Sequence, residues 1–169
     1  MFAATDVHYL DSGAARAALV LSGTGTFEVI AAERVVVVPE VAEYEPGAFF
    51  RRELPCLRAV LAGVADVSLL VVDGYVDLDP DGRPGLGAHA HAELGIAVIG
   101  VAKSRFATAT HAVPVMRGGA TRPLFVTAAG LPADEAAKMV RAMAGAHRLP
   151  DALRRVDQLA RATGPGPSS

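Results

Sequence analysis

Two apolar runs constrain the fold more than any other part of the sequence: DVSLLVVD at residues 66–73 and GIAVIGVAK at residues 95–103. An apolar run of this length, bounded by turn residues, is typical of a strand buried on both faces of a sheet. Each run follows a segment that we expect to be a helix, over residues 52–64 and 86–94. Helices connect parallel strands, so the alternation predicts parallel strands covered by helices.

The first 38 residues have a different pattern. Residues 2–9, 14–22 and 26–38 are apolar or β-branched, and the short turn-rich pieces DSGA and SGTGT separate them. Short connections of this kind join antiparallel neighbours. We therefore expect a three-stranded antiparallel meander.

The rest of the chain adds loops, one strand and two helices. We expect a loop at 39–51, a loop or irregular hairpin at 105–122, a last strand at 122–127, and helices over 133–146 and from Pro150 onward. Together these elements predict an α/β fold with a mixed sheet, in which three antiparallel strands come first and parallel strands later, with helices on both faces.

Composition is consistent with one core. The chain has 169 residues, 51% of them apolar, so we expect a single domain over residues 1–163 and a disordered tail, GPGPSS, at 164–169. No apolar stretch reaches the roughly 18 residues that span a bilayer, and the N-terminus lacks the features of a signal peptide. We expect a cytoplasmic protein without a membrane partner. Cys56 has the spacing of a core residue, and a catalytic thiol is the alternative.

The net charge of −2 conceals an asymmetry between the two halves of the chain. Residues 1–84 hold 6 Lys and Arg against 13 Asp and Glu, whereas residues 85–169 hold 10 against 5. An acidic half beside a basic half suits a site that holds metal ions and meets phosphates. Solvated charges scattered over both halves are the alternative interpretation.

Acidic residues occur where ligands bind in α/β sheets. Asp73 is the last residue of a predicted parallel strand, Asp6 lies on the first strand, and Glu53 opens the crossing helix. If these carboxylates converge, their like charges require a cation, and hard oxygen ligands favour Mg²⁺ or Mn²⁺. The later acids of DLDPDG lack the remaining ligands of an EF-hand, which favours an acidic surface turn.

Five segments, in matching order and spacing, resemble the endonuclease V family: TDVHY, EYEPGAFFRRE, LLVVDG, GLGAHAHAELGIAVIGVAK and HRLPDALRRVDQLAR. The resemblance spans essentially the whole chain. It implies a ribonuclease H-like fold and a magnesium-dependent endonuclease that acts on DNA or RNA containing deaminated adenine (inosine), as in DNA repair. We also expect a monomer or weak dimer.

The resemblance implies roles for individual residues. Asp6 and Asp73 are expected to hold Mg²⁺ or Mn²⁺ with Glu53, and Lys103 to stabilise the phosphate in the transition state. For Glu53, a helix-start carboxylate is the alternative, and for Lys103 an ordinary lysine at a strand end.

Nucleic-acid contacts are also implied. Tyr44, with Pro46 and Gly47, matches the strand-separating wedge, and a flipped base would enter a pocket near Gly47 and Gly74. Tyr44 packing over its own loop is an equally acceptable interpretation.

Several positions depart from the family pattern. Tyr75 and Val76 replace a His-Gly pair, Asp79 and Gly130 stand where the family has histidines, and glutamates flank Tyr44. Asp79 is interpreted either as a compensating metal ligand or as a turn former.

Two main hypotheses follow. The first is an active metal-dependent nuclease. The second is a catalytically impaired homologue that binds nucleic acid or a nucleotide-like ligand without cleaving it. A ribonuclease H-like module for protein contacts is a third interpretation, and a bound metal would argue against it.

Overall fold

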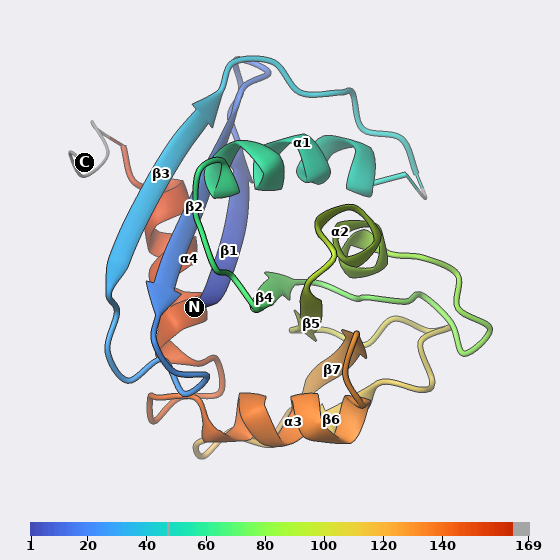
Figure 1. The fold of residues 1–169 in the computed structure, drawn as a ribbon. Coiled ribbons are helices and arrows are strands. Elements are labelled where there is room, and N and C mark those ends of the chain that lie inside the picture. Colours follow the sequence, from blue (N-terminus) through green and yellow to red (C-terminus); the bar gives the residue numbers. More distant parts are fainter. Residues whose placement is uncertain (47, 164–169) are drawn as a thin grey trace.

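The computed structural model describes residues 1–46 and 48–163, and the tail expected at 164–169 lies outside this part. Within it the chain forms seven strands and four helices (Figure 1). The strands are β1 (Phe2–Tyr9), β2 (Ala15–Ser22), β3 (Ala32–Val38), β4 (Leu69–Asp73), β5 (Ala97–Ala102), β6 (Val113–Val115) and β7 (Leu124–Ala129). The helices are α1 (Phe50–Leu61), α2 (Leu86–Leu94), α3 (Ala133–Ala142) and α4 (Asp151–Arg161).

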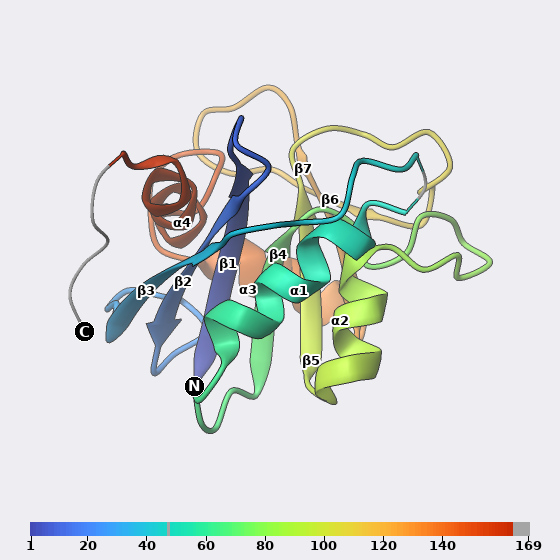
Figure 2. The same cartoon turned by 90° about the horizontal axis from the view of Figure 1, so that it is seen from above.

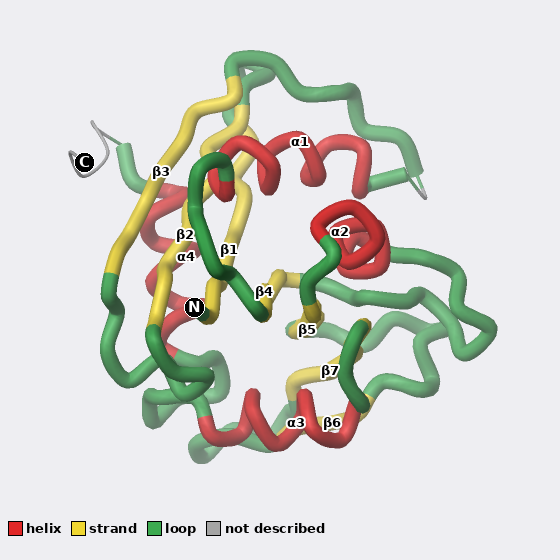
Figure 3. The backbone as a smooth tube through the Cα atoms, in the orientation of Figure 1, coloured by secondary structure: helices red, strands yellow, loops and turns green. Residues whose placement is uncertain are grey.

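All seven strands form one mixed sheet in the order β3-β2-β1-β4-β5-β7-β6. The predicted meander β1-β2-β3 is antiparallel, and β1, β4 and β5 are parallel neighbours, which confirms the mixed α/β sheet. One expectation needs correction, because β7 is antiparallel to β5 and β6 is antiparallel to β7. No helix lies between β5 and β7 among the described residues (Figure 3); the chain runs from β5 to the edge strand β6 and then turns back into β7, which lies beside β5.

Helices cover both faces of the sheet, as predicted. α1 and α2 pack on one face, and α3 and α4 pack on the other (Figures 1 and 2). Successive residues of a strand point to opposite faces, so Leu70 packs with the first pair of helices and Val71 with the second. This double burial explains the unbroken apolar runs in β4 and β5.

The start of one predicted strand changes. β3 begins at Ala32 rather than at residue 26, because residues 26–31 fold irregularly and Phe27, with φ of 53°, inserts its ring into the core.

Cys56 is fully buried on α1, and burial raises the pKa of its thiol to about 11, which opposes the catalytic-thiol alternative. Within the described residues, no helix has the length and apolar character needed to cross a membrane.

The backbone just beyond β4 lies in close contact with two glycines. A Cβ atom added at Gly100 of β5 would lie 2.5 Å from the carbonyl oxygen of Gly74 and 2.9 Å from the backbone nitrogen of Val76. A Cβ added at Gly87 of α2 would lie 2.6 Å from a methyl of Val76. The absence of side chains at both positions therefore sets the path of the chain immediately after Asp73.

The substitution Gly100→Ala tests this packing. We expect it to lower the free energy of unfolding by about 1–3 kcal/mol, because the new methyl group displaces backbone rather than a flexible side chain. Urea unfolding measures the change, and Gly119→Ala is a matched control, since a Cβ there meets nothing within 4 Å. Equal stability of the two variants would contradict the prediction.

Candidate active site

The sheet brings the predicted acids together at one end of its strands. Asp6 follows Thr5, which pairs in parallel register with Val72 of β4, so Asp6 lies beside Asp73, the last residue of β4, while β1 itself runs on to Tyr9. Lys103 follows β5 at the same end of the sheet, and its Nζ lies 2.7 Å from Oδ2 of Asp73. Ligands of α/β sheets bind beyond the carboxyl ends of the parallel strands, which is this end.

Glu53 approaches the two aspartates from the first turn of α1. Only 6% of the residue is exposed, and within the part of the chain that the structure describes its Oε2 has no hydrogen-bond partner. Burial, together with the charges of Asp6 and Asp73, raises the pKa of Glu53 to about 8. An ionised carboxylate in this position is costly unless a positive group joins it.

Asp6 has a similar environment. Burial and the charge of Asp73 raise its pKa to about 6, although its Oδ1 accepts a hydrogen bond of 2.9 Å from the backbone N–H of Val7. The charge of Asp157, on α4, raises this pKa further.

Asp157 is a site residue that the sequence analysis missed. It lines the same cavity, about 370 Å³ in volume, as Asp6, Glu53 and Asp73. Its Oδ1 also accepts a bond of 2.7 Å from Arg161, one helical turn later. An acid and an arginine four residues apart on an amphipathic helix resemble an ordinary exposed ion pair, so the sequence carried no distinguishing signal.

The donor set fits a hard divalent cation. Four carboxylates line one cavity, and Glu53 has a buried oxygen without a partner. Among the described residues, however, no three acidic, histidine or cysteine side chains are arranged as a metal site. The Lys103 ammonium contacts Asp73 instead.

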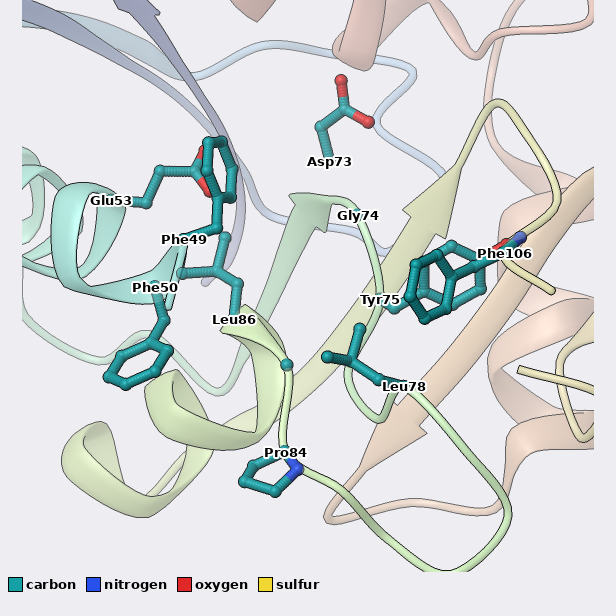
Figure 4. Close-up of a pocket in the computed structure, with 11 residues that line it drawn as sticks. Phe49, Phe50, Glu53, Asp73, Gly74, Tyr75, Leu78, Pro84, Leu86 and Phe106 are labelled. Atoms are coloured by element: carbon teal, nitrogen blue, oxygen red, sulfur yellow. The ribbon is translucent and has the colours of Figure 1, made fainter. Parts of the chain in front are cut away.

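A second cavity, of about 280 Å³, adjoins the acids and includes Glu53 and Asp73 at one end (Figure 4). We call it the aromatic pocket. Its other lining residues are Phe49, Phe50, Gly74, Tyr75, Leu78, Pro84, Gly85, Leu86 and Phe106. A mostly apolar cavity beside charged groups is typical of a ligand site.

The residues predicted to form the wedge belong to the segment between β3 and α1. Tyr44 is 64% exposed and Pro46 is also exposed, whereas Gly47 lies outside the described residues. Glu45 pairs with Arg51 at 2.9 Å. The exposed tyrosine therefore borders the side of the molecule on which α1 begins.

Two positions that depart from the family pattern, Asp79 and Gly130, lie away from the cavity lined by the four carboxylates, which we call the acid cavity. Oδ1 of Asp79 accepts hydrogen bonds from the backbone N–H groups of Asp81 and Arg83, at 3.1 and 3.0 Å, which is the behaviour of a turn former. Gly130 follows Ala129, which pairs with Val98 near the start of β5. Gly130 therefore lies near the opposite end of the strands from Lys103, which follows the last residue of β5.

Comparison with known proteins identifies the family. A model of the endonuclease V family matches residues 1–158. Endonuclease V of Streptomyces coelicolor is 34% identical, over 93% of this chain and 76% of the relative. The chain belongs to the endonuclease V family. Endonuclease V of Azotobacter vinelandii is 33% identical, over 95% of this chain and 81% of the relative.

Solved endonuclease V structures share the fold. The crystal structure from Streptomyces avermitilis has a TM-score of 0.79 and 29% identity, covering 95% of this chain and 79% of that one. Ciona intestinalis endonuclease V, in complex with DNA containing an inosine followed by a ribo-adenosine, has a TM-score of 0.81 at 17% identity, covering 95% and 83%. The ribonuclease H-like fold is thus confirmed. Family membership makes the chain a nuclease, a hydrolase, and nothing in the comparisons favours the impaired homologue.

Replacing Glu53 by glutamine tests the electrostatic cost of the acid cavity. Because the folded pKa lies above the ordinary value, wild-type stability is lost as pH rises toward 8, and Glu53→Gln avoids this loss. In EDTA we expect the variant to be more stable by about 2–4 kcal/mol at pH 8 and by less than about 1 kcal/mol at pH 5.

Urea unfolding at the two pH values measures this difference. Glu28→Gln, at an exposed glutamate, is the matched control and should change little at either pH. A Glu53→Gln variant that is no more stable than wild type at pH 8 would contradict the prediction.

Proposed function

We propose that this endonuclease V-family chain is a Mg²⁺- or Mn²⁺-dependent endonuclease that hydrolyses a phosphodiester bond near a deaminated base such as inosine, in DNA or RNA. The observation that carries the proposal is the buried, unpartnered oxygen of Glu53 in a cavity shared with Asp6 and Asp73. Lys103 pairs with Asp73 and Arg161 with Asp157, but neither reaches this oxygen of Glu53, so a bound cation would stabilise the group, which supports a catalytic rather than a structural role.

Four carboxylates would hold the metal: Asp6, Glu53, Asp73 and Asp157. When bound, the ion would activate a water molecule and stabilise charge on the leaving oxygen. The protein's own contribution is to hold the acids at one sheet edge, with Asp6 and Asp73 fixed by strand register and Glu53 by the first turn of α1.

Lys103 would act on the phosphate. Its ammonium pairs with Asp73 at the mouth of the site, and its side chain remains 44% exposed, so it can meet an entering phosphate. A cation fixed at this position stabilises the negative charge that develops during phosphoryl transfer.

The wedge loop and the aromatic pocket would handle the base. Tyr44, with Pro46 and Gly47, would separate the strands. A flipped nucleotide would then enter the pocket beside Gly74, whose lack of a side chain allows close approach. The pocket adjoins Asp73, which keeps the flipped base near the bond to be cleaved.

Cleavage of end-labelled oligonucleotides tests the function. DNA and RNA strands with and without one inosine are incubated with Mg²⁺ or Mn²⁺, using wild type and Asp73→Asn. We expect metal-dependent cutting near inosine that falls about 100-fold or more in the variant, because a metal ligand is lost. If the folded wild type cuts none of these substrates, the proposal is wrong.

Asp157→Asn tests the acid contributed by α4. We expect the cleavage rate to fall about tenfold or more and the Mg²⁺ concentration for half-maximal rate to rise, since one cavity oxygen ligand loses its charge. Asp134→Asn, an exposed acid at the start of α3, is the matched control. An unchanged Mg²⁺ requirement in Asp157→Asn would exclude this residue from the metal site.

A further inference from the structure

Three buried polar atoms at or beside the acid cavity lack hydrogen-bond partners within the described part of the chain. They are the hydroxyl of Tyr9, Nε of Arg52 and Oε2 of Glu53. Buried polar groups of folded proteins are almost always hydrogen-bonded, so exceptions that lie close together require an explanation. Of the three residues, only Glu53 has a role in the metal site described above.

Tyr9 reaches the acid cavity from the end of β1. The strand continues three residues beyond Asp6, and successive side chains point to opposite faces, so Tyr9 packs on the face that α1 covers. Its side chain lines the same cavity as Glu53. Burial and then the charge of Glu53 raise the pKa of the Tyr9 hydroxyl, which indicates that the two groups are close.

The ring of Tyr9 is held from two sides. The guanidinium carbon of Arg52 lies 4.0 Å from the centroid of the ring, and the ring of Phe49 meets it edge-on at 6.1 Å between centroids. A cation over the face and an aromatic contact leave the ring little freedom to move. The direction of the hydroxyl is therefore fixed by residues on either side of Glu53 in the first turn of α1.

The unpartnered groups are complementary. A tyrosine hydroxyl and an arginine Nε–H can donate, whereas an ionised carboxylate can only accept. Carboxylates that bind metals are themselves hydrogen-bonded by groups behind them, which hold the ligand in its orientation. Oε2 of Glu53 is buried and needs such a donor once the carboxylate is bound to a cation.

We propose, on the basis of the metal site in the proposed function, that Tyr9 is a positioning residue for Glu53. In the metal-loaded protein its hydroxyl donates a hydrogen bond to the Glu53 carboxylate, directly or through one water molecule, and Arg52 holds the ring in place. Tyr9 touches neither the ion nor the nucleic acid in this role. It raises the affinity for the ion by orienting one of the ligands.

The affinity for Mn²⁺ tests this inference without nucleic acid. The dissociation constant is measured by electron paramagnetic resonance, in which free and bound Mn²⁺ give distinguishable signals. Tyr9→Phe removes only the hydroxyl, and we expect the dissociation constant to rise about tenfold. Tyr44→Phe removes an exposed hydroxyl outside the acid cavity and should leave Mn²⁺ binding unchanged.

A double-mutant cycle shows whether Tyr9 acts through Glu53. In a Glu53→Gln background we expect Tyr9→Phe to change the Mn²⁺ dissociation constant by less than about twofold, because the ligand that it orients has lost its charge. A merely structural role for Tyr9 would weaken binding equally in both backgrounds.

Urea unfolding in EDTA supplies a second measurement. Since the hydroxyl has no partner in the metal-free structure, Tyr9→Phe should be at least as stable as wild type there.

Three results would overturn the inference: an unchanged Mn²⁺ affinity in Tyr9→Phe, an equal loss in both backgrounds, or a Tyr9→Phe variant less stable than wild type in EDTA. Cleavage of inosine-containing strands separates it from the proposed function. Metal-dependent cutting by a wild type whose Mn²⁺ affinity does not depend on Tyr9 overturns only the inference. Coupling of Tyr9 to Glu53 in a protein that cuts no substrate overturns only the nuclease proposal, and a folded wild type that binds no Mn²⁺ overturns both.

Discussion

The rest of the structure depends on holding together four carboxylates that repel one another, one of them buried and three partly buried. Asp6, Glu53, Asp73 and Asp157 come from two strands and two helices, yet they line one cavity. The parallel pairing of β1 with β4 brings the first aspartates together, and the helices on opposite faces add the others. A sheet buried on both faces is rigid enough to keep these carboxylates close together despite their repulsion. The raised pKa values of Asp6 and Glu53 reflect the electrostatic cost of ionising them there.

Two arginines from the basic half of the chain support this arrangement through hydrogen bonds to the backbone. Arg117 is 6% exposed, and it donates to backbone carbonyls of the segment between α3 and α4. Arg148 donates to the carbonyls of Lys103, Arg122 and Pro123. These two arginines join the loops after β5 to the start of α4, which carries Asp157. The excess of positive charge in the second half therefore includes internal ties as well as surface available to phosphates.

The sequence was sufficient where one physical signal dominated. Unbroken apolar runs identified β4 and β5 as strands buried on both faces, and the position of Asp73 at the end of a parallel strand indicated the end of the sheet where it meets Asp6. The antiparallel orientation of β7 could not be predicted, because the residues between β5 and β7 form no helix and show no pattern that indicates the direction of the next strand. Asp157 has the pattern of a surface ion pair, and its proximity to Asp6 depends on how α4 packs. The aromatic pocket combines residues from separate segments, and no local pattern predicts such a cavity.

The contact between Val76 and Gly87 makes two positions interdependent in volume. Where the family motif has glycine, this chain has a buried valine, and the helix residue facing it has no side chain. A return to glycine at 76 alone would open a void beneath the pocket, and a larger residue at 87 alone would collide with the valine. A larger residue at 87 therefore requires a smaller one at 76, so the volumes of the two positions are coupled in the stability of this chain.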